Sequence, residues 1–203
     1  MIFLSRLQCV MLVVLGVLPL PSAAHLVSTG LGPIYDGIGH FFLSLEDLLP
    51  LLALMTLGGL NGVAAGRRIM FVLPSAWLIG GILGSLIAVG TIVPAYVAPL
   101  MAIMLGVMVA TDAQLPERVL TGVIGIVGSA SGLTTGIALA TQTNNLQLIL
   151  GSAIALCVLA TAVPALVIVA ATSRPWMRIA VRVLGSWIAG VGLLMLGWQV
   201  RIS

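Results

Sequence analysis

The chain has 203 residues, of which 61% are hydrophobic and 6% are charged. Soluble domains average about 25% charged residues, so this composition excludes a soluble globular protein and predicts an all-α integral membrane protein in a lipid bilayer. The basic residues that give the formal net charge of +3 are scattered arginines without a basic run, which argues against a nucleic-acid partner.

Residues 1–24 are predicted to be a cleavable N-terminal signal peptide. Arg6 precedes an apolar run, and small residues lead up to Ala24, as at a cleavage site. The alternative is an uncleaved first transmembrane helix. Cleavage after Ala24 would make His25 the N-terminal residue, so that its α-amine and imidazole could bind one metal ion together. Otherwise His25 is an exposed histidine without a ligand role.

Residues 25–46 form the predicted outer-face metal-ligand segment. Together with the residue that follows, they contain both histidines and three of the five acidic residues of the chain. Imidazole and carboxylate groups bind divalent transition metals, so these side chains are the candidate metal ligands. They are His25, Asp36, His40, Glu46 and Asp47.

Two local structures are consistent with this segment. If one helix runs through residues 34–49, most of the candidate ligands share one stripe. If the chain instead breaks at Ser44, that serine caps the next helix, and Glu46 and Asp47 lie in its first turn. Acids in a first turn also complement the helix dipole without binding a ligand. The apolar neighbours of His40 favour a partly buried imidazole with a ligand or proton-carrier role.

Residues 47–203 are predicted to be a six-helix transmembrane domain. Six apolar stretches are each long enough to cross a hydrocarbon core of about 30 Å. They are residues 47–66, 69–90, 93–111, 118–140, 146–171 and 177–199.

The arginines predict the orientation of this domain. With residue 25 outside, the loops at 67–68, 112–117 and 172–176 are cytoplasmic, and most arginines lie in or near them. The orientation predicted by the positive-inside rule therefore agrees with the orientation predicted by the signal peptide. Both the mature N-terminus and the C-terminus are expected on the outer side.

Glycines at every fourth position give the fourth expected span a small face, at Gly128, Gly132 and Gly136. This spacing favours close helix packing. The alternative is that serine and threonine hydroxyls on this helix line a polar path through the membrane.

Three other polar or acidic residues in the expected spans and turns bear on the function. Asn61, in the first span, is a candidate kink site or weak ligand. Asp112 and Glu117 belong to a cytoplasmic turn, where we expect them to be solvated and to pair with Arg118.

The run AHLVSTGLGPIYDGIGHFFLSLEDLLPLLALMTLGGLNGVAAGRR resembles the HupE/UreJ family of hydrogenase- and urease-associated membrane proteins. That family often carries a histidine followed six and seven residues later by Asp-His. Here His40 matches the histidine, Glu46 takes the aspartate position, and Asp47 replaces the second histidine. A carboxylate in place of an imidazole shifts a site toward harder, oxygen-preferring ions.

The resemblance implies a function that is transport rather than enzymatic. Members of the family are regarded as nickel or cobalt permeases. We therefore expect a multi-pass protein of the bacterial inner membrane that takes up a divalent transition metal, with zinc or manganese also compatible, and works alongside hydrogenase or urease maturation proteins. Two alternatives remain open: a membrane metallohydrolase that uses the same ligands, and an accessory protein that assists assembly without transporting.

Overall fold

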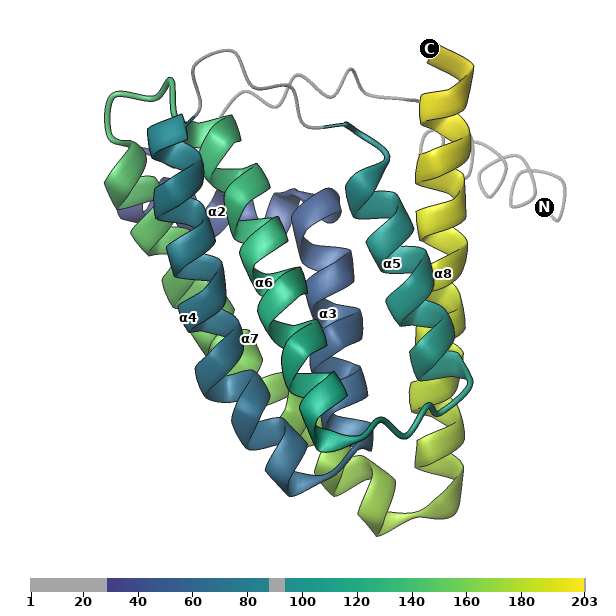
Figure 1. The fold of residues 1–203 in the computed structure, drawn as a ribbon. Coiled ribbons are helices and arrows are strands. Elements are labelled where there is room, and N and C mark those ends of the chain that lie inside the picture. The colour runs from purple at the N-terminus through teal and green to yellow at the C-terminus, as the bar shows by residue number, and fades with distance from the viewer. Residues whose placement is uncertain (1–28, 88–93, 203) are drawn as a thin grey trace, which may run out of the picture.

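The computed structural model describes residues 29–87 and 94–202, so the expected signal peptide and His25 lie outside the described residues (Figure 1). The described residues form seven α-helices and no β-strand, which confirms the all-α class. The helices are α2 (Pro33–Leu43), α3 (Leu45–Leu60), α4 (Val63–Ile87), α5 (Val97–Ala110), α6 (Glu117–Leu139), α7 (Asn145–Ser173) and α8 (Pro175–Ile202).

Length and hydropathy identify the helices that can cross a bilayer. Four qualify among the described residues: α4, α6, α7 and most of α8. The α2–α3 pair qualifies as a fifth if it is one broken span, since its helices are bent by 73° relative to each other. The 14 residues of α5 extend only about 21 Å. The protein is a multi-pass membrane protein, whereas the expected count of six spans is not confirmed.

The break between α2 and α3 lies at Ser44, as the second local alternative predicted. Ser44 has an extended backbone, with φ −81° and ψ 93°, and its N–H donates to the His40 carbonyl over 2.9 Å to close α2. The Ser44 carbonyl accepts from Leu48 N–H over 2.9 Å at the start of α3. The Ser44 side chain makes no capping hydrogen bond. The prediction of one continuous helix through residues 34–49 was therefore wrong.

Glycines allow the backbones of α4 and α6 to pack in direct contact. A Cβ atom at Gly132 would lie 2.0 Å from the Trp77 carbonyl oxygen, and one at Gly80 would lie 2.2 Å from the Ser129 carbonyl oxygen. Only glycine permits such an approach, so the packing interpretation of the α6 stripe is confirmed. The two helices run side by side on one flank of the bundle (Figure 1).

Two further helix pairs form in the same way. Between α2 and α7, a Cβ at Gly37 would lie 2.2 Å from the Leu148 carbonyl oxygen, and the Ser152 hydroxyl donates to the Gly37 carbonyl over 2.9 Å. Between α5 and α8, a Cβ at Gly106 would lie 2.7 Å from the Ala189 nitrogen. Helix α3 is central because it packs against both α7 and α5, and its side chains supply much of the buried core.

Candidate metal-capture cavity

A cavity of about 310 Å³ lies where α2, α3, α5 and α6 come together. Four lining residues come from α2, the break and α3, four from the beginning of α5 and the residues before it, and four from α6. They are His40, Ser44, Glu46, Asp47, Pro94, Ala95, Val97, Ala98, Thr134, Thr135, Ile137 and Ala138. Three of the five predicted metal ligands therefore share one cavity.

The break at Ser44 brings these ligands together. It leaves His40 in the last turn of α2 and puts Glu46 and Asp47 in the first turn of α3. The free N–H groups at the beginning of α3 carry a partial positive charge that favours nearby carboxylates. The cavity thus combines an imidazole and two carboxylates at two helix ends.

The two acids occupy different positions. The half-buried carboxyl of Asp47 interacts with Ser44, with His40 and with Thr135 of α6. Thr135 is only 2% exposed, and its hydroxyl donates to the Ser131 carbonyl over 2.9 Å. Asp47 therefore lies on the inner side of the cavity, against a buried polar part of α6.

Glu46 is exposed, and it lines two hollows: the cavity and a second, neighbouring one. This second hollow has a volume of about 280 Å³ and lies against the end of α8. Its other lining residues are Leu194, Met195, Trp198 and Gln199. Glu46 thus stands between the two hollows, at the more accessible edge of the cavity.

Asp36 does not join this cavity. One of its carboxylate oxygens accepts hydrogen bonds from both the backbone N–H and the hydroxyl of Thr29, each over 2.6 Å. Asp36 thereby fastens the chain that enters α2. Within the described ranges, no three His, Cys, Asp or Glu side chains lie close enough to hold one metal ion. His40, Glu46 and Asp47 share the cavity without forming a closed ligand cage.

Part of the cavity wall is predictable from the sequence. The alternative interpretation of α6 predicts hydroxyls along a polar path, and Thr134 and Thr135 do line the cavity. The α5 side, from Pro94 to Ala98, carried no signal because its lining residues are apolar or small. Only the way the helices are assembled shows that this segment faces the candidate ligands.

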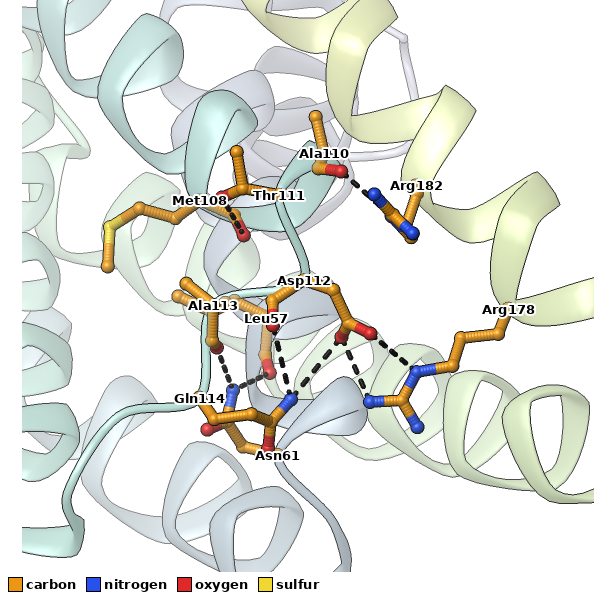
Figure 2. Close-up of polar contacts among 10 residues, drawn as sticks. All are labelled: Leu57, Asn61, Met108, Ala110, Thr111, Asp112, Ala113, Gln114, Arg178 and Arg182. Carbon is orange, nitrogen blue, oxygen red and sulfur yellow. Dashed lines mark hydrogen bonds and ion pairs between the residues drawn. The ribbon is translucent and has the colours of Figure 1, made fainter.

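Polar groups at the opposite end of the bundle have structural partners. The Asn61 amide is hydrogen-bonded to backbone groups at the end of α3, so Asn61 does not kink that helix, whereas its role as a weak ligand stays a prediction. The expected pairing with Arg118 is replaced by other ion pairs: Glu117 with Arg68, and Asp112 with Arg178. Figure 2 shows the Asp112 carboxylate facing the Arg178 guanidinium.

The ion pair between Asp112 and Arg178 contains two hydrogen bonds. Arg178 Nε donates to one carboxylate oxygen over 2.6 Å and Nη2 to the other over 3.0 Å. These bonds stabilise the ionised carboxylate, so Arg178 holds the pKa of Asp112 below its ordinary value.

Comparison with protein families gives a match over most of the chain. The family described as HupE / UreJ protein matches residues 12–195. No curated protein matches the chain. No solved structure matches it either.

Proposed function

The chain belongs to the HupE/UreJ family, and on this premise we propose that it is a membrane permease that takes up a divalent transition metal, nickel or cobalt first. The observation that carries the proposal is that His40, Glu46 and Asp47 line one cavity at the break between α2 and α3. The metal ion is the transported substrate, captured in that cavity. Neither catalysis nor a resident cofactor is part of the proposal.

The ligand chemistry supports modest capture of such an ion. An imidazole with carboxylates suits first-row divalent metals, and zinc or manganese would also fit. The remaining coordination positions would be filled by water or by hydroxyls such as those of Ser44 and Thr135. A transport site must also release its ion, so an incomplete protein ligand set is suited to the task.

A broken helix is a common device in transporters. Where a spanning segment is interrupted, the two half-helix ends direct their backbone dipoles at the substrate site. Here the break separates the helix with His40 from the helix with both acids. His25, if cleavage makes it N-terminal, and Asp36 would serve as outer ligands that attract the ion before it reaches the cavity.

The proposed orientation follows from the arginines. The connections α3–α4, α5–α6 and α7–α8 lie at the end of the bundle opposite α2 (Figure 1). In or near them are Arg67, Arg68, Arg118, Arg174, Arg178 and Arg182. The positive-inside rule would make this end cytoplasmic and would open the cavity to the periplasm of a bacterial inner membrane. Imported metal would then reach the hydrogenase or urease maturation proteins.

The test is the metal content of cells. Cell-associated nickel, cobalt, zinc and manganese would be measured by elemental analysis in cells with the wild type, with His40→Ala or with no protein. Gln142→Ala, in an exposed turn outside the cavity, is the control variant. We expect one metal to accumulate with the wild type and the control but not with His40→Ala, at equal membrane abundance.

Two results would contradict the proposal. Either no metal accumulates with the wild type, or His40→Ala accumulates as much as the wild type does. Metal-dependent hydrolysis by the purified chain would then favour the hydrolase, and co-purification of a maturation protein would favour the accessory role.

A further inference from the structure

Helices α5 and α8 form a paired unit. A Cβ at Gly106 would lie 2.7 Å from the Ala189 nitrogen, and one at Gly185 would lie 2.5 Å from Val109 Cγ1. These close approaches fit the two helices together along their length, side by side on one flank of the bundle (Figure 1). We call them the α5–α8 pair. Such closely packed helices are expected to move as one body.

At one end of the bundle, the metal-capture cavity lies between the beginning of α5 and its neighbours α3 and α6. The beginning of α5 supplies Val97 and Ala98 to one wall, while α3 and α6 supply the opposite walls through residues such as Asp47 and Thr135. The beginning of α5 therefore borders the same cavity as α3 and α6 at this end.

At the other end, Asn61 joins α3 to the loop after α5. Its Nδ2 donates to the Ala113 carbonyl over 3.0 Å and to the Leu57 carbonyl over 2.9 Å (Figure 2). Its Oδ1 accepts from the Leu115 N–H over 2.9 Å. We call the two bonds to the loop the Asn61 bridge. The length of α3, about 24 Å, separates this bridge from the cavity.

The loop is in turn fastened to α8. Asp112 adopts a left-handed conformation, with φ +55°, and Ala113 N–H donates to the Met108 carbonyl over 2.9 Å, which is a Schellman end to α5. The Asp112 carboxylate holds Arg178, and Arg182 Nε donates to the Ala110 carbonyl over 2.9 Å (Figure 2). The Asn61 bridge therefore connects α3 to the whole α5–α8 pair.

We propose that the Asn61 bridge closes one end of the protein while the metal-capture cavity is open at the other, and that its release lets the α5–α8 pair pivot on α3 so that the cavity closes. This inference rests on the proposed transport function, because a permease must expose its site to one side at a time. The structure holds the cavity-open arrangement. The bridge is suited to this role because its partners lie in a loop whose backbone water can solvate after release.

Thiol labelling of the purified full chain tests the inference without any metal. In a background with Cys9→Ser and Cys157→Ser, Ala98→Cys reports on the cavity and Leu57→Cys reports on the bridged end. Ala98 is half-buried in the cavity wall, whereas Leu57 is 0% exposed. The initial rate of reaction with a water-soluble maleimide would be measured for each reporter.

The bridge is weakened by Asn61→Asp and removed by Asn61→Leu. The first variant loses both donated hydrogen bonds, and the second also loses the acceptor, so one can report if the other fails to fold. The control is Thr56→Val on the same helix, since among the described residues the Thr56 hydroxyl is bonded only to the Leu52 carbonyl within α3. Thr56 is as buried as the core, at 1% exposure.

We expect labelling of the Leu57→Cys reporter to rise about tenfold in Asn61→Leu and less in Asn61→Asp, because lost hydrogen bonds shift the ratio of the two states. Labelling of the Ala98→Cys reporter should fall, and Thr56→Val should change neither rate. Unchanged rates, or a rise at both reporters, would overturn the inference. If His40-dependent uptake is present but labelling does not shift, only the Asn61 bridge is wrong. If labelling shifts but no metal accumulates, the proposed function is wrong instead.

Discussion

The two ends of the bundle use similar polar residues in opposite ways. At the cavity end, His40, Glu46 and Asp47 face a hollow of about 310 Å³. At the bridged end, Asn61 and Asp112 are bonded to backbone groups and to an arginine. A polar side chain inside a membrane protein needs a partner or space for one, and the cavity leaves such space beside His40, Glu46 and Asp47. The cavity end is therefore where an outside ligand has room to bind.

The largest expected effect is a loss of metal accumulation when the acidic residues of the cavity are substituted. We expect Asp47→Asn to lower metal accumulation at least about tenfold, because Asp47 lies on the inner side of the cavity beside His40 and Thr135. Glu46→Gln should lower it only about twofold to threefold, since Glu46 is at the exposed edge. Elemental analysis at matched abundance would measure both. Equal effects would remove the distinction between an inner and an outer acid.

The next largest effect concerns the packing of α6 against α4. Gly132→Ala should destabilise the protein by about 3 kcal/mol, because the new Cβ would lie 2.0 Å from the Trp77 carbonyl oxygen and force α4 and α6 apart. Gly125→Ala on the same helix has no neighbouring atom within 4 Å. That control should be neutral or stabilising by up to about 1 kcal/mol. Thermal unfolding in detergent would measure both, and equal losses would contradict the packing argument.

A smaller effect is expected at the bridged end. Asp112→Asn should cost about 1 kcal/mol, a value reduced by solvent because the Arg178 side chain is 41% exposed. The folded pKa of Asp112 is below its ordinary value of 3.8, so the ion pair contributes its full stability above that pH. This contribution is lost as the pH falls through the folded pKa.

Acid titration of unfolding would measure this dependence. The difference between the wild type and Asp112→Asn should be constant near neutral pH and shrink in acid. Arg178→Gln should remove most of that pH dependence, because Arg178 is the main group that lowers the pKa of Asp112, ahead of Arg182 and Gln114. A difference that grows in acid would have the wrong sign and would contradict the assignment.

The smallest effect is expected for Asp36. Asp36→Asn should change metal accumulation less than about twofold, since its carboxylate is already bonded to Thr29 outside the cavity. Elemental analysis of the same cells would show it. A loss as large as that of Asp47→Asn would make Asp36 a ligand and would extend the site beyond the cavity.

The sequence by itself determined the features that depend on neighbouring residues. Low charge and long apolar stretches predicted a multi-pass helical membrane protein, and the resemblance of residues around His40 identified the family. The glycine spacing predicted close packing of α6. The Ser44 break was one of two local alternatives. Such patterns are readable because helix geometry fixes which nearby residues share a face.

Only the tertiary structure decided which distant groups meet. It placed Glu46 and Asp47, but not Asp36, in one cavity with His40, and it brought Thr135 of α6 to Asp47. It also paired Asp112 with Arg178 rather than Arg118. These contacts join residues on different helices, and the bend at Ser44 and the way the helices pack against one another set them. Local sequence patterns do not contain that information.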